Sequence, residues 1–447
     1  MSISNVNAMP QSCEDEIDVT WNNDGRAVFM AVDRVMVNAV HRPTNNVRTR
    51  IPIRGFRQPL RDTTVVSGNT YQYFVFNWDG NRRPINPPGL SNSALAGICL
   101  FLTSTAFIQK YPAIFELLVP RGAVINDYTH EEGSILKGLW KHVHQLKPPN
   151  NNAVIQAKAV NLVQSISGKL EAVSRETPPA GAGSDYLVAY EFDAAGDADW
   201  KGPINLVADD GPIDQVTGST AIIQSTYDKQ GKFELLVPRG AVIDHYIHEQ
   251  GTFLAGQWTH VHTLKAPEDD VQITAVALTQ TALGILLGVA RISPPQGKGS
   301  DYLVAYEFDA AGDADWKGPI NLVADDGPID QVTGSTAIIQ NKQGKFELLV
   351  PRGAVIDQYT HEDGTLLEGL WKHVHTLKSP ENIQVRANWL IQSISGKFVA
   401  VARVSPPPGS GNDFLIGYEL DPASDFGWQG PVKLVADDGP ILIGGNP

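Results

Sequence analysis

The sequence predicts an all-β fold of the propeller class, and two observations lead to that prediction. First, the 41 residues from Ser184 to Gln224 recur without change from Ser300 to Gln340, so the chain of 447 residues is a repeat array. Second, short apolar runs rich in Val, Ile, Leu, Tyr and Phe alternate with clusters of Gly, Pro, Asp and Asn. Short strands at even spacing, separated by turn residues, are typical of all-β repeat folds.

Each period of the array contains two related half-units. One opens with FELLVPRGAVI, and the other contains YEFDAAGDADW or the variant YELDPASDFGW. The first phrase begins at Phe115, Phe233 and Phe346, and the second at Tyr190, Tyr306 and Tyr418. No stretch of about 12 residues inside the repeats has a helical period, which argues against a helical solenoid.

We count seven units, each long enough for a four-stranded blade, and therefore expect one seven-bladed β-propeller over residues 1–447. The expected blades are residues 27–113, 114–168, 169–231, 232–284, 285–344, 345–396 and 397–447. The last unit stops after VADDGP, and residues 16–26 look like its missing continuation. We expect the N-terminal and C-terminal strands to pair, with residues 16–26 completing the last blade, because closure removes exposed sheet edges.

Composition limits the partners and the location of the protein. The net charge is −14, with a pI near 5.2 and scattered Lys and Arg, which disfavours nucleic acid as a partner. No apolar run approaches the length of a membrane span, and the polar N-terminus lacks the features of a signal peptide. We expect a protein that is cytoplasmic or released without a classical signal peptide. The two cysteines, Cys13 and Cys99, occupy no repeated position, which favours a fold independent of disulfides.

One phrase resembles a known repeat family. The run STAIIQSTYDKQGKFELLVPRGAVIDHYIHE, from Ser219 to Glu249, and the Trp-x-Gly-Pro turn at Trp200 are similar to the repeat of the seven-bladed β-propeller lectins known from Photorhabdus, which are tectonin-like. A blade of that family carries an IQS…GNFELV phrase, a His-Tyr-Trp stretch and a Trp-x-Gly-Pro stretch. Here Ile247 and Thr360 replace the Trp of the second stretch. The resemblance implies a propeller that binds glycans or glycoconjugates, fucose-like or methylated sugars among them.

A repeated aromatic and histidine pattern is the richest candidate site. It reads Tyr-x-His, followed ten residues after the His by Trp-x-His-Val-His. Residues two apart on a strand share a face, so the Trp and both later His would form one wall. Such a wall suits a sugar, because rings cover C–H faces and imidazoles bond hydroxyls. The expected ligand-binding residues are Tyr128, His130, Trp140, His142 and His144; Tyr246, His248, Trp258, His260 and His262; Tyr359, His361, Trp371, His373 and His375; and the tryptophans Trp200, Trp316 and Trp428.

Other interpretations of these and neighbouring residues stay open. The histidines could instead bond backbone carbonyls between blades, or His-x-His could supply two metal ligands. No Asp, Glu or Cys stands at metal spacing, so we expect no metal and no cofactor. The acidic run from Asp193 to Asp199 offers carboxylates for calcium, but it lacks the twelve-residue loop, and we interpret it as a turn. The arginine-rich stretch from Arg42 to Arg83 is either a solvated insertion or a surface for a partner or an anion.

The repetition also guides the functional prediction. The sequence contains no G-x-S-x-G, H-E-x-x-H or P-loop motif, and its distinctive residues are copied three times. We therefore expect a non-catalytic, multivalent lectin, because several weak sites gain strength when they engage one surface together. The alternatives are a non-catalytic protein-interaction scaffold and a propeller hydrolase or lyase with its site in the central channel. A homo-oligomer is compatible with either.

Overall fold

The computed structural model describes residues 105–447 except for 111–113, 132, 150–154, 180, 194–195, 198, 226–230, 250–252, 296, 310–314, 363–364, 408–409, 424–426 and 444–447; of residues 1–104 it describes the strands alone, as backbone. The chain divides into two compact units, residues 1–101 and 102–447. Within the described part, no helix is long and apolar enough to cross a membrane.

The first unit contains two small antiparallel sheets. One has the order β1-β2-β5, and in the other β3 lies between β4 and β6, with β7 and β8 both pairing β6. The strands are β1 (Ser4–Pro10), β2 (Ile17–Asn22), β3 (Phe29–Val37), β4 (Thr49–Ile51), β5 (Leu60–Asp62), β6 (Thr70–Trp78), β7 (Gly89–Leu90) and β8 (Ala94–Leu95). The side chains of the arginine-rich stretch and of both cysteines lie outside the described residues.

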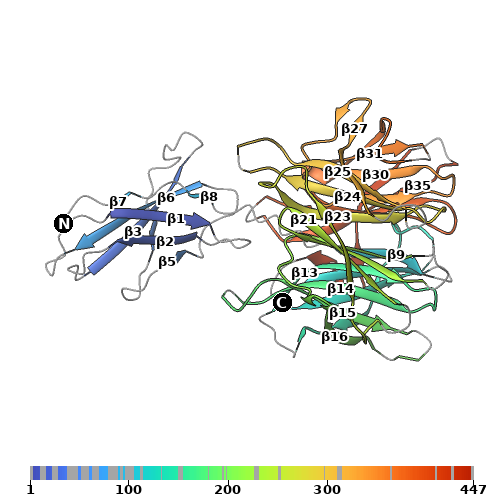
Figure 1. Ribbon diagram of the computed structural model, residues 1–447, viewed down its shortest axis with the longest axis horizontal. Coiled ribbons are helices and arrows are strands. Elements are labelled where there is room, and N and C mark those ends of the chain that lie inside the picture. The colour runs from blue at the N-terminus through green and yellow to red at the C-terminus, as the bar shows by residue number, and fades with distance from the viewer. Residues whose placement is uncertain are drawn as a thin grey trace. The chain divides into compact units, whose positions relative to one another are not determined.

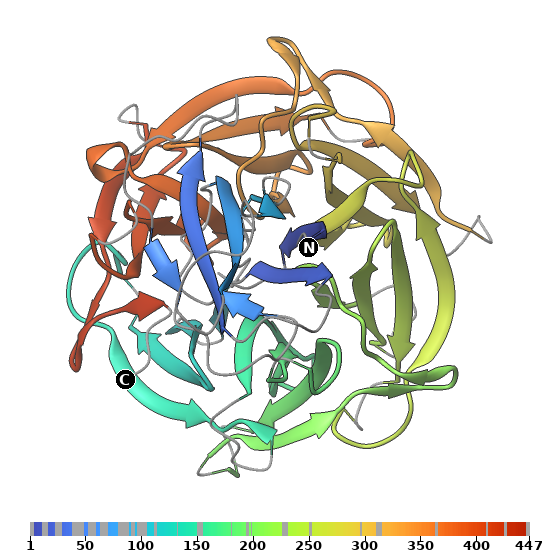
Figure 2. The same ribbon diagram turned by 90° about the vertical axis from the view of Figure 1, so that its left-hand side faces the viewer.

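Six antiparallel four-stranded sheets form the second unit, and they stand as blades around a ring (Figures 1 and 2). Blade 1 is β9 (Ala106–Lys110), β10 (Ile114–Arg121), β11 (Val124–His130) and β12 (Lys141–Leu146). Blade 2 is β13 (Gln156–Gln164), β14 (Leu170–Thr177), β15 (Tyr186–Phe192) and β16 (Lys201–Asn205). Blade 3 is β19 (Ala221–Gln224), β20 (Phe233–Arg239), β21 (Val242–His248) and β22 (Thr259–Lys265).

The next three blades repeat these two types. Blade 4 is β23 (Gln272–Gln280), β24 (Leu286–Ser293), β25 (Tyr302–Phe308) and β26 (Lys317–Asn321). Blade 5 is β29 (Ala337–Gln340), β30 (Phe346–Arg352), β31 (Val355–His361) and β32 (Lys372–Lys378), followed by a 3-10 turn at Pro380–Asn382. Blade 6 is β33 (Gln384–Gln392), β34 (Phe398–Ser405), β35 (Asp413–Leu420) and β36 (Gln429–Lys433), with β39 (Leu442–Ile443) also pairing β35.

The all-β propeller is confirmed, but the count of seven blades is wrong. The error lies in residues 27–113, which we had taken as the first blade. Most of that range belongs to the first unit, where β3 pairs with β4 and β6. The expected pairing of the segment 16–26 with the last blade is also wrong, because its strand β2 pairs with β1 and β5.

Each blade buries both faces, which explains its continuous apolar strands. In β10, Leu117 packs in a cluster with Val401 of blade 6, whereas the next residue, Leu118, packs with Val160 of blade 2. The alternation of side chains along a strand thus divides β10 between two interfaces. The apolar core of the unit is the set of such interfaces around the ring.

A short hairpin follows each even-numbered blade. The hairpins are β17–β18 (Val207–Ala208 and Gly211–Pro212), β27–β28 (Val323–Ala324 and Gly327–Pro328) and β37–β38 (Val435–Ala436 and Gly439–Pro440). The last one closes the ring. The amide of Trp140 donates to the Val435 carbonyl at 2.9 Å, and that of Asp437 to the Trp140 carbonyl at 2.8 Å. The amide of Trp258 makes the same bond to Val207 at 3.0 Å, so the hairpin β37–β38 docks on blade 1 as β17–β18 docks on blade 3.

A ring of glutamines joins the innermost strands. Five of these strands end in one, and in β9 it is the residue before the last: Gln109, Gln164, Gln224, Gln280, Gln340 and Gln392. Gln340 accepts a hydrogen bond from the Ala282 amide of blade 4 at 2.8 Å, and Gln109 accepts one from the Ile394 amide of blade 6 at 2.7 Å. The second bond is another non-covalent link between the first and last blades.

Candidate functional site

The three repeated tryptophans of the expected sugar-binding wall lie inside the blade interfaces. Trp140, Trp258 and Trp371 are each 1% exposed and belong to three separate apolar clusters. The Trp140 ring meets Phe107 edge to face, with centroids 6.3 Å apart. The indole faces of these residues are therefore occupied by the core, where they stabilise the contact between blades.

The first histidine of each pattern braces a loop. In blade 1, Nδ1 of His130 lies 2.7 Å from the Glu131 carbonyl and Nε2 lies 2.8 Å from that of Lys137. His248 and His361 make the same pair of contacts in blades 3 and 5. Both partners are acceptors, so both contacts become hydrogen bonds only when each ring nitrogen carries a hydrogen.

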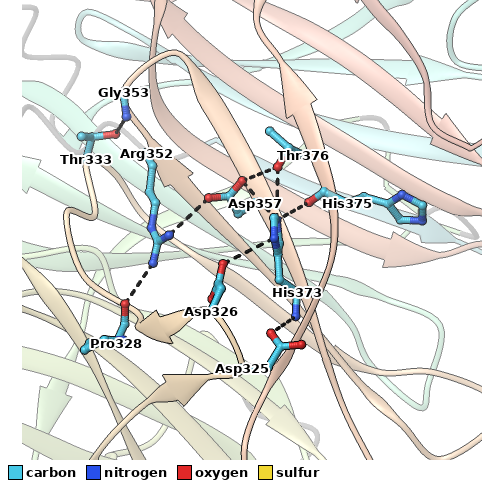
Figure 3. A network of polar contacts seen from close by, with 10 residues as sticks. All are labelled: Asp325, Asp326, Pro328, Thr333, Arg352, Gly353, Asp357, His373, His375 and Thr376. Carbon is cyan, nitrogen blue, oxygen red and sulfur yellow. Dashed lines mark hydrogen bonds and ion pairs between the residues drawn. The ribbon is translucent and has the colours of Figure 1, made fainter.

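The second histidine of each pattern forms a polar cluster with the hairpin of the preceding blade (Figure 3). The His373 amide donates to Oδ1 of Asp325 at 3.0 Å, and its Nδ1 lies 3.4 Å from Oδ2 of Asp326. On the other side of the ring, Nε2 lies 3.5 Å from Oδ1 of Asp357, which also accepts from Thr376. Arg352 reaches Oδ2 of Asp357 at 3.4 Å. His373 is 31% exposed, so this cluster lies at the surface.

The cluster is repeated in blade 3 and altered in blade 1. His260 lies 3.2 Å from Asp210 and 3.4 Å from Asp244. In blade 1, His142 keeps a contact of 3.2 Å with Asp438, but Asn126 occupies the place of Asp244. The aromatic members Tyr128, Tyr246 and Tyr359 lie beneath the second histidines, buried, with ring centroids 5.0 to 5.2 Å apart. These clusters hold neighbouring blades together and present one imidazole edge to solvent.

The third histidines and the remaining tryptophans link odd-numbered blades to the next blade. His144 lies 3.7 Å from Asp199 and His262 lies 3.5 Å from Asp315, whereas His375 is exposed. Burial, with the nearby His245, lowers the pKa of His262. Nε1 of each remaining indole reaches a buried polar group: Trp200 to Asp127 at 2.9 Å, Trp316 to His245 at 3.2 Å and Trp428 to Gln358 at 2.7 Å.

Nothing in the described part of the chain gathers three or more His, Cys, Asp or Glu side chains in a way that could hold a metal ion. The acidic run from Asp193 is a turn in its described residues. There Asp197 accepts a hydrogen bond from the Asp193 amide at 3.0 Å and pairs with Lys201 at 2.8 Å.

The most distinctive polar site was not predicted from the sequence. In blade 2, Glu171 on β14 and Glu191 on β15 are direct cross-strand partners. Side chains in such a register point to the same face, with Cβ atoms about 4.5 to 5.5 Å apart. Both residues are buried, and Glu191 pairs with Lys169 at 2.8 Å. We call these three residues the carboxyl pair and its lysine.

The two carboxyl groups have different environments. Burial raises the pKa of Glu171 to about 8, and the charge of Glu191 adds to the shift. Oε2 of Glu171 is enclosed and has no hydrogen-bond partner among the described residues. The raised pKa favours the protonated form of Glu171 at neutral pH, and the ammonium of Lys169 lies against Glu191.

The carboxyl pair occurs in one of the three equivalent blades. The residue that faces Glu307 in blade 4 is Leu287, and the residue that faces Glu419 in blade 6 is Val399. Both of these lie in apolar clusters. Blade 2 thus has an acid, Glu171, at a position where the other two blades of this type have an apolar core residue. The sequence already contains this difference. The second residue is Glu in LEAVSRET of β14, but Leu in LLGVARIS of β24 and Val in FVAVARVS of β34.

Comparisons with known proteins support the fold. No protein-family model matches the chain, and no curated protein does so. An α-L-arabinanase of Penicillium chrysogenum, solved with arabinobiose, is similar to it with a TM-score of 0.50 and 11% identity, over 68% of this chain and 88% of that one. A GH93 α-L-arabinofuranosidase of Fusarium graminearum gives 0.50 and 12%, over 71% and 92%. A Dyadobacter fermentans protein of unknown function gives 0.50 and 11%, over 71% and 94%.

These neighbours overturn two of our expectations. We had predicted a multivalent lectin and a non-catalytic protein, but the two structural neighbours named by activity are enzymes that act on sugars. Both predictions are wrong on this comparison. The resemblance to the Photorhabdus lectins is reduced to the shared propeller architecture, with six blades in place of seven. At these identities, the similarity establishes the fold alone.

Proposed function

We propose that the chain is a glycoside hydrolase whose acid and nucleophile are the carboxyl pair of blade 2. The observation that carries the proposal is the replacement of a core leucine or valine by Glu171, directly opposite Glu191. Placing an acid without a partner in an apolar slot costs stability. In a repeat array, departures from a local rule are expected at functional sites. Glu176 on the same strand is a second buried acid, where blades 4 and 6 carry Ile292 and Val404, but no acid lies directly opposite it.

The chemistry follows from the difference between the two environments. Two titratable groups whose pKa values are pushed apart can take the roles of acid and base. Glu171, with its raised pKa, donates its proton to the glycosidic oxygen as the bond to the leaving group breaks. The carboxylate of Glu191 attacks the anomeric carbon, and a covalent glycosyl intermediate forms. Water then displaces Glu191 and gives its proton to Glu171, which restores both groups.

The spacing of the pair favours retention of configuration. Retaining glycosidases hold their two carboxyl groups about 5 to 5.5 Å apart, and inverting ones separate them by about 6.5 to 9.5 Å. Direct cross-strand partners have Cβ atoms about 4.5 to 5.5 Å apart, which suits the shorter spacing. We therefore expect the product to keep the anomeric configuration of the substrate.

Lys169 positions the nucleophile and marks the route of approach. Its ammonium lies 2.8 Å from Oε1 of Glu191, and the side-chain exposures of the two residues are 29% and 10%. Glu171 lies deeper, at 2%. A substrate would reach the pair from the solvent side, past Lys169, with the acid beneath it. The neighbours named as an arabinanase and an arabinofuranosidase make arabinan the first polysaccharide to test.

The test is release of reducing sugar from a panel of plant and microbial polysaccharides, with arabinan included. Glu171→Gln and Glu191→Gln should each reduce the released sugar by at least about a hundredfold, as expected for loss of a positioned acid or nucleophile. The matched control is Glu307→Gln, because Glu307 has the same position in blade 4 and faces a leucine.

The control separates chemistry from folding. Glu307 accepts a hydrogen bond from Thr365 at 2.6 Å, so Glu307→Gln replaces a charged acceptor by a neutral one at a contact between blades and leaves the carboxyl pair unchanged. Glu307→Gln should retain activity at a slightly lower melting temperature. Equal activity of all three variants, or no activity of the wild type on any glycan of the panel, would exclude the proposal.

A further inference from the structure

A second asymmetric feature lies in blade 6, away from the carboxyl pair. A cavity of about 840 Å³ is lined by the start of β33, the turn between β34 and β35, and the end of β36. Its charged or aromatic members are Arg386 on β33, Phe414 on β35 and Lys433 at the end of β36, with the exposed Glu381 also on its lining. The volume falls within the range of small-molecule sites, about 300 to 1,000 Å³.

Arg386 is a half-buried cation with no acid in direct contact. Its side chain is half-buried and makes no hydrogen bond or ion pair with any described residue. The charge of Asp413 acts on Arg386 from a distance, and Oδ2 of Asp413 accepts from Nε of Arg403 at 2.6 Å and from the Ser405 hydroxyl at 2.7 Å. Burial lowers the pKa of Arg386, and the charge of Arg403 adds to the effect. An anion in the cavity would offset this desolvation.

Lys433 adds a second positive charge at the same cavity. It is exposed, and its ammonium lies 4.5 Å from the centre of the Phe414 ring. No ion pair is formed by Lys433 with the residues that the structure describes. The contact with Phe414 holds the ammonium near the cavity, because the ring face attracts a cation.

Among the three equivalent blades, the combination of two cations without the acid is found in blade 6. Blade 4 has Thr274 where blade 6 has Arg386, and Asn321 where it has Lys433. In blade 4, Asp330 bridges to Tyr302, whereas in blade 6 the equivalent pair is Leu442 and Phe414. Compared with blade 4, blade 6 thus has two more cations and one acid fewer at corresponding positions. Blade 2 is intermediate, because it has a cation, Lys158, at the position of Arg386 but keeps the asparagine and the acid, as Asn205 and Asp214.

We propose that this cavity binds a small carboxylate-bearing ligand with an apolar or ring-shaped body. The planar guanidinium of Arg386 matches a carboxylate through two parallel hydrogen bonds. The rest of the cavity supplies apolar surface, from Ile383 and from prolines that include Pro380, Pro406 and Pro431. A uronic acid and an aromatic carboxylate share this chemistry. The site is independent of the hydrolase proposal, because none of its residues belongs to blade 2.

The experiment is a titration of the full chain with glucuronate, benzoate and inorganic phosphate, followed by calorimetry and by chemical shifts of the arginine side chains. We expect at least one carboxylate to saturate with a dissociation constant of about 1 mM or lower, corresponding to about −4 kcal/mol. Preference for glucuronate would indicate a sugar acid, and preference for benzoate an aromatic acid. Phosphate binding as tightly as either carboxylate would overturn the ligand class.

Two substitutions copied from blade 4 test the residues. Arg386→Thr and Lys433→Asn should each weaken carboxylate binding at least about tenfold, and both residues are already tolerated at equivalent positions of the fold. Lys372→Asn, which removes an exposed lysine at the start of β32, is the matched control and should bind as the wild type does. If Arg386→Thr does not fold, the exposed Lys433 alone decides the matter. Unchanged binding in a folded Lys433→Asn, or no saturation of the wild type by either carboxylate, would refute the site.

Discussion

Ring closure without a covalent link leads to a sharp comparison between two isoleucines. Ile441 follows the hairpin β37–β38 and is 0% exposed, in the cluster that contains Trp140 of blade 1. Ile213 is its equivalent after β17–β18 and is 1% exposed, in the cluster that contains Trp258 of blade 3. Their amides make the same bond, to Leu434 at 3.3 Å and to Leu206 at 3.0 Å. Ile441→Ala and Ile213→Ala therefore remove nearly identical contacts.

The expected local cost is the same for both substitutions, about 2 to 5 kcal/mol for truncating a buried isoleucine. That is a large fraction of the roughly 5 to 15 kcal/mol that stabilises a typical domain. The consequences should differ, because blades 2 and 3 follow one another in the chain, whereas blades 1 and 6 are joined only by non-covalent contacts. Weakening the hairpin on blade 1 lets the ring open before the blades unfold.

Urea unfolding distinguishes the two cases. Ile213→Ala should shift the midpoint and keep the m-value, because m reports the surface exposed in one cooperative step. Ile441→Ala should shift the midpoint and also lower the apparent m-value, since an opened ring becomes populated. Indistinguishable m-values and midpoints would show that closure by β37–β38 contributes no more than any internal junction, and our account of the ring would fail.

Three further predictions rest on single groups. If Glu171 is the acid, sugar release should fall as pH rises through about 8, because the group then loses the proton that it donates; a flat profile from pH 6 to 9 in active enzyme would contradict this role. Burial also raises the pKa of Glu176 from 4.5 to about 8. The stability that the protonated form gives is therefore complete below about pH 4.5 and is lost as pH rises to about 8. Glu176→Gln should flatten the fall of the urea midpoint between pH 5 and 8, and an unchanged slope would exclude this cause. Gly334→Ala should prevent folding or cost several kcal/mol, because the new Cβ would lie 1.9 Å from the Arg386 carbonyl oxygen, whereas Gly196→Ala, with no atom within 4 Å of its Cβ, should melt as the wild type does.

The repeat made the propeller architecture predictable, but the number of blades could not be predicted from it. Apolar alternation identifies a strand and its buried face, and this succeeded for the FELLVPR strands in blades 1, 3 and 5. It does not identify the partner of a strand. The run AVFMAVDRVMV reads as the opening of a blade, yet its strand β3 pairs with β6 in a separate sheet. Pairing depends on contacts between distant segments, which a local pattern cannot encode.

The interpretation of the candidate site depends on the same kind of distant contact. Aromatic and histidine residues at fixed spacing suggest a ligand wall, but the same spacing suits an interface between blades, where Trp140 is buried. Repetition cannot separate these uses, because every interface of a ring is repeated as well. The His142 amide donates a hydrogen bond to Oδ1 of Asp437 at 3.0 Å, and these residues are 295 positions apart in the chain. Only the folded ring shows that the copy of this repeated spacing in blade 1 takes part in closure.

Departures from the repeat are therefore more informative about function than the repeat itself. A contact that every equivalent blade makes, such as the bond from a tyrosine hydroxyl to a lysine carbonyl by Tyr190, Tyr306 and Tyr418, is explained by building the ring. Glu171 and Arg386 have no such explanation, since the blades that carry Leu287 and Thr274 instead form the same sheets with the same register. Each buries or half-buries a charge-bearing group that the fold does not require. Folding alone would favour an apolar residue at the position of Glu171, and the proposed reaction supplies a reason for the acid. Blade 2 also has a cation, Lys158, at the position of Arg386, so the argument for a ligand in blade 6 rests on Arg386 and Lys433 together.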